Sequence, residues 1–394
     1  MKNHRTSSDE TLCIHAGEDR HGRNGAVTAD ITLSSVFAFK DVDELRRYNE
    51  GRSDAYIYTR YANPTTRTAE EKIAALEGGE DCVVTASGMA ATFAAIMSVC
   101  RAGDEIVSML DIYGGTLKLF EGVLERFGIK TRFVPYRDLS RIDRFITRRT
   151  RVLFLESPTN PTLRCVNLEG LAAVARKYNV VVIVDNTFAT PILQKPLALG
   201  ADMVIHSATK YLGGHSDVTA GAVVGSKEAM AAVREMTKIT GGCLDPAASY
   251  MLIRGMKTLE LRVSRACENA EIIALFLREH KKVSRVMYPG FEETEGHEAA
   301  RVQMSDYGMM VSFDLKGGGK AAERFINALK LWYLAPSLGG VESSVSYPVL
   351  TSHHGLSKER LELLDVSPAT VRLSVGIEHA ADLVEDLEQA LDRA

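Results

Sequence analysis

The sequence predicts an α/β protein whose larger part is a mainly parallel sheet with helices on both faces. Between residues 82 and 226, short apolar runs alternate with helix-like stretches such as AATFAAIMSVC and LEGLAAVARKY. Continuous apolar strands separated by helices are typical of parallel sheets that are buried on both sides. The expected strands are CVVTAS (82–87), EIVSML (105–110), RVLFLES (151–157), VVVIVDN (180–186), DMVIHS (202–207) and GAVVGS (221–226).

The pattern around this sheet predicts three regions. Residues 1–62 mix polar and aromatic side chains with weak periodicity, which indicates an extended N-terminal arm, and residues 63–255 form the large domain. A helical pattern over about 247–279 is too long for one lobe, so we expect it to bridge two domains. The second is a smaller C-terminal α/β domain, residues 256–394, with GMMVSFDL, VRLSVGIE and a final amphipathic helix.

The composition excludes several classes of protein. The chain has 394 residues, 45% hydrophobic and 25% charged, which is typical of a globular protein large enough for two lobes. A formal net charge of -4 gives no electrostatic basis for binding nucleic acid. The first residues lack the apolar core of a signal peptide, and no run of about 18 apolar residues predicts a membrane span. The six cysteines are scattered without a CxxC pair, so we expect reduced thiols and a cytoplasmic location.

Candidate site residues follow the predicted strands, because ligands of open α/β sheets bind beyond the carboxyl ends of the strands. The run CVVTAS leads into Ser87, Gly88 and Met89 at the start of an alanine-rich helix. The free amides of a helix N-terminus bind phosphate well. Ser207 and Thr209, at the end of DMVIHS, add hydroxyl groups to the same edge of the sheet. These residues predict a phosphate-binding site.

Three more side chains at this edge predict which phosphate compound binds. Asp185 ends a buried apolar strand, where a carboxylate is costly unless a cation such as a protonated pyridine nitrogen meets it. Lys210 lies near glycines, and loss of water there favours its neutral amine and an imine with an aldehyde. Tyr113 follows EIVSML and could cover a flat ring. Taken alone, each has a structural interpretation, as a helix cap, an exposed lysine or a core aromatic. Together they predict a site for pyridoxal 5'-phosphate (PLP).

Residues 184–221, VDNTFATPILQKPLALGADMVIHSATKYLGGHSDVTAG, closely resemble the PLP-lysine region of the Cys/Met metabolism family. Further motifs fit this family in order over nearly the whole chain: YTRYANPTTRTAEEKIAALEG, VTASGMAA, DIYGGT, ESPTNPTLRCV, LIRGMKTLELR, PSLGGVES and VRLSVGIE. The resemblance implies a fold-type I PLP-dependent transferase fold, which is similar to aspartate aminotransferase. It also implies an enzyme of the trans-sulfuration group, which includes cystathionine γ-synthases, cystathionine and methionine γ-lyases and homoserine-ester sulfhydrylases.

The resemblance implies a role for each cofactor-binding residue. Lys210 would bind the cofactor aldehyde and move protons, and Asp185 would pair with the ring nitrogen. Tyr113 would stack on the ring, contact the substrate and act in acid–base chemistry. The phosphate ligands would be Ser87, Gly88, Met89, Ser207 and Thr209.

The family pattern also implies substrate contacts and an oligomer. Asn160 would lie near the cofactor hydroxyl, and Arg372 would bind the α-carboxylate of a small amino-acid substrate with Ser337 beside it. Tyr58 and Arg60 resemble a pair that the family donates to the cofactor phosphate of the neighbouring subunit, where Tyr58 also faces substrate. A homodimer is then the smallest active unit, and a tetramer built as a dimer of dimers is expected.

Three positions bear on which reaction of the family is expected, γ-replacement or γ-elimination. Methionine γ-lyases typically carry Cys at the position of Gly115, and plant-type cystathionine γ-synthases carry a phosphate-binding Lys there. Pro336 resembles the plant-type synthases, since bacterial synthases and cystathionine γ-lyases tend to have Glu. Lys118 either meets a distal carboxylate of the substrate or is a solvated helix lysine. The sequence favours a cystathionine γ-synthase-like enzyme that joins an activated homoserine to cysteine, with the γ-lyases and a homoserine-ester sulfhydrylase as alternatives.

Other classes of protein fit the sequence less well. A non-catalytic protein that keeps the fold is a remote alternative, because the lysine, carboxylate, tyrosine and arginine are all intact. A phosphate-loop nucleotide enzyme is excluded, because GGGK (317–320) is followed by Ala321 and lacks the required earlier glycine, so this stretch predicts a turn between a strand and a helix. His206, His353 and His354 show no metal-ligand spacing, and we expect no metal.

Overall fold

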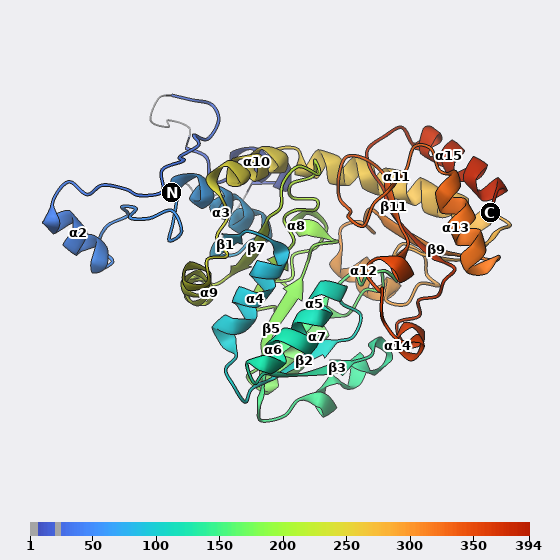
Figure 1. Ribbon diagram of the computed structural model, residues 1–394, viewed down its shortest axis with the longest axis horizontal. Coiled ribbons are helices and arrows are strands. Elements are labelled where there is room, and N and C mark those ends of the chain that lie inside the picture. Colours follow the sequence, from blue (N-terminus) through green and yellow to red (C-terminus); the bar gives the residue numbers. More distant parts are fainter. Residues whose placement is uncertain (1–6, 20–24) are drawn as a thin grey trace.

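A seven-stranded sheet forms the centre of the larger domain in the computed structural model, which describes residues 7–19 and 25–394 (Figure 1). Its strands are β1 (Asp81–Thr85), β2 (Glu105–Met109), β3 (Lys130–Val134), β4 (Thr150–Glu156), β5 (Val181–Asp185), β6 (Met203–His206) and β7 (Gly221–Gly225). Their order across the sheet is β1-β7-β6-β5-β4-β2-β3. Only β7 runs antiparallel to its neighbours, so the mainly parallel sheet predicted from the sequence is confirmed.

The edge strand β3 is the one that the apolar pattern did not predict. Its sequence KTRFV places Lys130 and Arg132 at exposed positions, and only Val134 is buried. An edge strand is paired on one side only and often carries charges that discourage further pairing. A search for continuous apolar runs therefore misses such a strand.

The side chains of the sheet alternate between two hydrophobic cores. Val83 and Val223 face the core that includes residues of α4 (Gly88–Val99), α7 (Leu168–Lys177) and α9 (Lys227–Thr240). Val84 and Val224 face the core that includes residues of α1 (Asp9–His15), α3 (Pro64–Glu77), α8 (Thr190–Leu193) and α10 (Pro246–Met256). Packing on both faces of the sheet therefore holds the strand ends in place, and it also restricts the residues that directly follow them.

The helical pattern predicted over 247–279 forms two helices with a short break between them. α10 ends at Met256 and α11 (Leu259–Glu279) begins after Thr258, whose φ of -114° and ψ of 14° leave the helical region. The buried Arg262 guanidinium holds this break, since it donates to the carbonyl oxygens of Tyr211 and Gly255 at 2.8 Å each. From there α11 runs to the smaller domain, as Figure 1 shows.

The smaller domain contains a five-stranded, mainly antiparallel sheet in the order β10-β11-β12-β9-β8. Its strands are β8 (Val283–Met287), β9 (Met310–Leu315), β10 (Tyr333–Leu334), β11 (Ser344–Ser346) and β12 (Thr370–Ser374). The helices α13 (Gly318–Ala328) and α15 (Ala380–Asp392) pack on it with the end of α11. Of the stretch 317–320, which the sequence predicted as a turn, only Gly317 lies in the turn, and residues 318–320 already form the start of α13. This part of the chain also contains α12 (His297–Gln303) and α14 (Lys358–Leu363).

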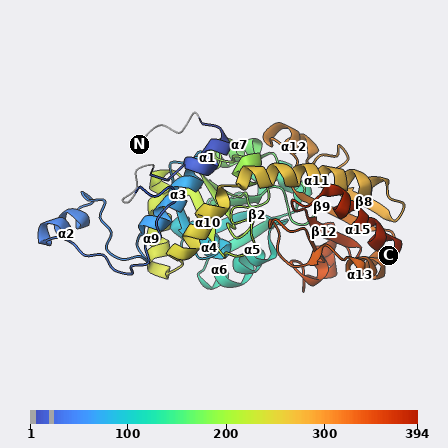
Figure 2. The same ribbon diagram turned by 90° about the horizontal axis from the view of Figure 1, so that it is seen from above.

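The N-terminal arm is partly helical and partly free of the body. α1 packs against α3 and α11, whereas α2 (Val42–Asn49) projects away from the rest of the chain in both views (Figures 1 and 2). Apolar side chains on this projecting segment face solvent, with Leu33 70% and Val42 69% exposed. Within the described residues, none of the helices is both long and apolar enough to cross a membrane.

Candidate active site

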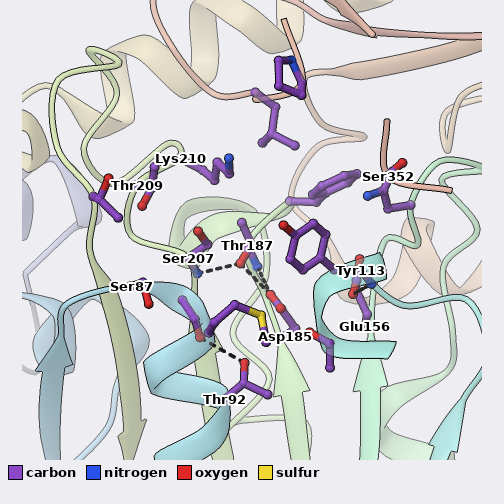
Figure 3. Close-up of a pocket in the computed structure, with 18 of the residues that line it drawn as sticks. Ser87, Thr92, Tyr113, Glu156, Asp185, Thr187, Ser207, Thr209, Lys210 and Ser352 are labelled. Atoms are coloured by element: carbon purple, nitrogen blue, oxygen red, sulfur yellow. Dashed lines mark hydrogen bonds between the residues drawn. The ribbon is translucent and has the colours of Figure 1, made fainter. Parts of the chain in front are cut away.

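The predicted cofactor and substrate residues meet in a cavity of about 220 Å³ at the carboxyl ends of the strands of the large sheet (Figure 3). The smaller domain closes one side of this cavity with Pro336, Leu338, Ser352 and Arg372. The residues predicted from the sequence that line it are Ser87, Gly88, Met89, Tyr113, Asn160, Asp185, Ser207, Thr209, Lys210 and Arg372. The structure therefore brings together side chains that lie up to 285 positions apart in the chain.

One end of the cavity is the N-terminus of α4. Ser87 caps this helix by accepting a hydrogen bond from the amide of Ala90 at 3.1 Å. The amides that precede Ala90 in α4 have no acceptors inside the helix, as at the start of any helix. A Cβ at Gly88 would lie 2.9 Å from Ser207 Cβ, so only glycine lets the helix start approach Ser207 this closely. Thr209 Oγ1 exchanges hydrogen bonds with the backbone of Ala220 at 3.0 and 3.1 Å. This end of the cavity can hold a phosphate group.

Asp185 is the carboxylate at the end of β5. Its Oδ1 accepts hydrogen bonds from the amide of Thr187 at 3.0 Å and from Thr187 Oγ1 at 2.5 Å. Burial raises the pKa of Asp185, and the two donors of Thr187 oppose that rise. Within the described ranges, no cation lies at ion-pair distance from this carboxylate, so a cationic group of a ligand would be stabilised beside it.

Lys210 projects into the cavity from the loop that follows β6. Its Nζ donates a hydrogen bond to Ser337 Oγ at 2.8 Å, so Ser337, which the sequence predicted as a substrate-binding residue beside Arg372, contacts the lysine as well. Burial, together with the positive charge of Arg372, lowers the pKa of Lys210 to about 8. At neutral pH a larger fraction of this amine is therefore neutral, and able to attack an aldehyde, than for an ordinary lysine.

Arg372 is a buried guanidinium on β12 with unused hydrogen-bonding capacity. Its Nη1 donates to Asn160 Oδ1 at 2.8 Å and its Nη2 to the carbonyl oxygen of Ser337 at 3.2 Å. Its Nε is buried and has no hydrogen-bond partner among the residues that the structure describes. Burial lowers the pKa of Arg372 to about 10, which still leaves it charged at neutral pH. A carboxylate is the ligand that a free guanidinium edge binds best.

Tyr113 stands on the opposite side of the cavity, directly before α5 (Gly114–Lys118). Its ring is 46% exposed and projects into the cavity, where Figure 3 shows it near Asp185. A Cβ at Gly115 would lie 2.4 Å from Tyr113 Cε1, so a side chain at position 115 would meet the edge of the Tyr113 ring in this orientation. Lys118, at the end of α5, is exposed and does not line the cavity.

Several residues of the site were not found from the sequence. Glu156 and Thr187 stand at or just after the ends of β4 and β5, so the rule that located Asp185 could have located them as well. Ser352 comes from a loop of the smaller domain that no strand or helix pattern marks, and only the packing of the two domains reveals it.

Tyr58 and Arg60 do not reach the cavity of their own chain. Tyr58 is 40% exposed, and the Arg60 guanidinium lies 5.4 Å from the ring of Tyr58 and 5.0 Å from that of Tyr61. Arg60 Nη1 donates to the carbonyl oxygen of Lys238 at 2.5 Å. Both side chains are thus held at the surface on the base of the projecting arm, outside the cluster that the other predicted residues form.

Comparison with known proteins places this site in a family. A family model described as "Cys/Met metabolism PLP-dependent enzyme" matches residues 10–392. The chain is 45% identical to an L-methionine gamma-lyase of Fusobacterium nucleatum subsp. polymorphum, over 97% of this chain and 98% of that protein. It is 42% identical to the chloroplastic cystathionine gamma-synthase 1 of Arabidopsis thaliana, over 98% of this chain and 69% of that protein.

A solved structure agrees with these relatives. The crystal structure of metB from Corynebacterium glutamicum superimposes with a TM-score of 0.93 at 39% identity and covers 99% of each chain. The fold-type I architecture that the sequence predicted is thus confirmed. The chain belongs to the Cys/Met metabolism family of PLP-dependent enzymes, and its cofactor is pyridoxal 5'-phosphate.

Proposed function

We propose that this enzyme catalyses γ-replacement, joining an activated homoserine to cysteine as a cystathionine γ-synthase does. The observation that carries this proposal is the close contact at Gly115, where a Cβ would lie 2.4 Å from the Tyr113 ring. The ring therefore fills the position at which methionine γ-lyases typically carry a cysteine. Pro336, in place of an acidic residue before Ser337, supports the same proposal. A phosphate ester is a poor candidate for the activated homoserine, because Gly115 offers no lysine to bind it.

γ-Elimination from methionine is the second candidate. The similarity to the Fusobacterium lyase over nearly the full length of both chains favours it. Cystathionine γ-lyase and homoserine-ester sulfhydrylase activities would use the same cavity. These reactions differ in the leaving group and in whether a thiol or water ends the reaction.

The cavity has the features that a PLP site requires. We propose that the start of α4, with Ser87, Gly88, Met89, Ser207 and Thr209, binds the phosphate group. Asp185 would neutralise the protonated ring nitrogen, which explains a buried carboxylate that forms no ion pair with the described residues. Tyr113 would cover the ring. When bound, PLP supplies an aldehyde that reacts with amines and a ring that withdraws electrons from the substrate α-carbon.

The residues of the chain would then bind the substrate and transfer its protons. Arg372 would hold the α-carboxylate of the substrate through its free Nε and one Nη group, while Asn160 fixes the guanidinium. Lys210, with its lowered pKa, would take the proton from the α-carbon and return it elsewhere on the substrate. The hydroxyl of Tyr113 would act as the acid or base for proton transfer at the γ-leaving group. Closure of the cavity by the smaller domain would exclude water from these proton transfers.

A substrate panel tests which reaction the enzyme performs. The purified protein is incubated with homoserine esters, cystathionine and methionine, each with and without cysteine, and the sulfur products and 2-oxobutanoate are identified. We expect cystathionine from an ester plus cysteine. Prompt 2-oxobutanoate from methionine alone, with no product from esters plus cysteine, would replace the proposal with the second candidate.

We also propose that the active unit is at least a dimer in which Tyr58 and Arg60 complete the cofactor site of the neighbouring subunit. Both side chains lie outside their own cavity, and the arm that carries them exposes apolar residues such as Leu33 and Val42. A second copy of the chain would cover these residues. A tetramer built as a dimer of dimers is the expected assembly. A cytoplasmic location is supported by the six cysteines, all within the described ranges and all unpaired.

Replacing Arg60 with alanine tests the shared site. We expect the dissociation constant of PLP to rise by about 10- to 100-fold, because one charge-assisted contact to phosphate is worth roughly 1.5–3 kcal/mol. Lys210 should still react with added PLP, as borohydride reduction and mass spectrometry would reveal. Arg52→Ala is a matched control on the same arm, since the Arg52 side chain forms an ion pair with the neighbouring, exposed Glu50. An unchanged PLP affinity in the Arg60 variant would count against the shared site.

A further inference from the structure

Glu156 is a buried carboxyl group in the cavity that the proposed chemistry does not use. It is the last residue of β4 and is 4% exposed. The register of the sheet places it directly opposite Asp185, the last residue of β5. Figure 3 shows it on the same side of the cavity as Tyr113. Any account of the site must therefore explain a second carboxyl group next to Asp185.

The Glu156 carboxyl group anchors Tyr113 through the backbone. Its Oε2 accepts the amide hydrogen of Tyr113 at 2.8 Å, and this is its only side-chain hydrogen bond to the described residues. Tyr113 is the residue before α5, and its own side chain makes no capping bond there. The Tyr113 side chain is half exposed, so little packing fixes its direction. The direction in which this ring projects thus depends on a backbone that Glu156 holds.

The charges around Glu156 decide its protonation state. Burial raises the pKa of Glu156 well above its usual range, and the neighbouring Asp185 raises it further. The other groups that face it are Asp111, also acidic, the Tyr113 amide and Arg372, whose Nη atoms are directed at Asn160 and at the Ser337 carbonyl. Asp185 accepts two hydrogen bonds and Glu156 only one, so a single negative charge on the pair belongs on Asp185.

We propose that Glu156 is a positioning residue that fixes Tyr113 over the cofactor by holding its amide, and that it does so as a neutral carboxylic acid so that Asp185 carries the charge. The proposal rests on the cofactor contacts proposed above for Asp185 and Tyr113. The two adjacent carboxyl groups then have different tasks: Asp185 faces the ring nitrogen as a carboxylate, and Glu156 orients Tyr113 as a neutral acid. Neighbouring acids take such different tasks when their environments give them different pKa values.

Two substitutions in the holoenzyme test the positioning part of the proposal. In Glu156→Ala we expect amide exchange of the peptide containing Tyr113 to become about tenfold faster and kcat/KM to fall about tenfold, as loss of one buried hydrogen bond predicts. The induced circular dichroism of the bound cofactor should also decrease, because it reports the packing of the ring. In Glu156→Gln the amide oxygen still accepts the bond, and we expect all three quantities to stay within about threefold of the original enzyme. Unchanged exchange and dichroism in Glu156→Ala would overturn the proposal.

An infrared difference spectrum tests the neutral state directly. The enzyme minus Glu156→Gln should show the carbonyl band of a protonated carboxylic acid at neutral pH, whereas carboxylate bands alone would overturn this part. Glu105→Gln is the matched control, since Glu105 is a buried carboxyl at the other end of β2 that pairs with Arg149. It should show carboxylate bands and leave the exchange of the Tyr113 peptide unaltered.

If the proposed cofactor contacts of Tyr113 were wrong, the variants would give a different pattern of results. If Tyr113 does not stack on the cofactor, Tyr113→Ala leaves the induced circular dichroism unchanged while Glu156→Ala still accelerates exchange at Tyr113. That combination would overturn the positioning of Tyr113 over the cofactor and leave only the backbone anchor. A loss of dichroism in both variants supports the full proposal.

Discussion

Replacing Lys210 with alanine is expected to lower kcat/KM by about 10³-fold or more, because the variant loses the amine that we propose both binds the cofactor and moves the α-proton. The structure provides a reason for using this lysine and no other. Its Nζ lies in the cavity at 2.8 Å from Ser337 Oγ, and burial with Arg372 nearby lowers its pKa to about 8. Steady-state rates on the substrate panel measure the loss, and borohydride reduction should no longer attach PLP to the protein.

A control separates this loss from a general effect of removing a lysine. Lys195 lies in the same stretch of sequence, residues 184–221, but forms an ion pair with Asp9 outside the cavity. Lys195→Ala should keep the rate within a few-fold of the original enzyme, as a surface pair worth at most about 1 kcal/mol predicts. Turnover by Lys210→Ala at more than a tenth of the original rate would show that another group carries the chemistry.

The sequence predicts the frame of the site well because the frame depends on local patterns. Each buried strand of the large sheet is a continuous apolar run, and Ser87, Asp185 and Lys210 follow such runs within a few residues. The parallel order of the strands then brings these residues to one edge. The break between α10 and α11 escaped prediction, because it depends on Arg262 bonding to two carbonyl oxygens in the folded chain and not on a helix-breaking residue.

The functional details that the sequence misses depend on contacts between distant segments. Glu156 is a strand-end acid like Asp185, and their hydrogen bonds distinguish them, since Glu156 accepts the Tyr113 amide and Asp185 accepts two bonds from Thr187. Ser352 reaches the cavity from the smaller domain, and the orphaned Nε of Arg372 becomes visible only once its other bonds are known. The positions of Tyr58 and Arg60 outside their own cavity are likewise a property of the folded arm.

Replacing Asp185 with asparagine is expected to lower kcat about 10²- to 10³-fold, since removal of one partner from a buried charge pair costs roughly 3–5 kcal/mol. The amide can still accept the hydrogen bonds of Thr187, so the fold at the end of β5 should persist. It carries no charge, however, and cannot hold a proton on the ring nitrogen of the cofactor. Because that proton makes the ring an electron sink, α-proton removal by Lys210 should slow much more than substrate binding weakens.

The kinetic pattern and a matched control decide between this effect and a simple loss of structure. Asp202→Asn makes the same change at the amino end of β6, where Asp202 Oδ2 accepts the amide of Val182 at 2.7 Å. We expect this control to lower the melting temperature at least as much as Asp185→Asn while kcat stays within a few-fold of the original. A deuterium isotope effect at the α-carbon should increase only in Asp185→Asn. If both variants lose activity equally and neither changes the isotope effect, Asp185 acts through the strand end and not through the charge of its carboxylate.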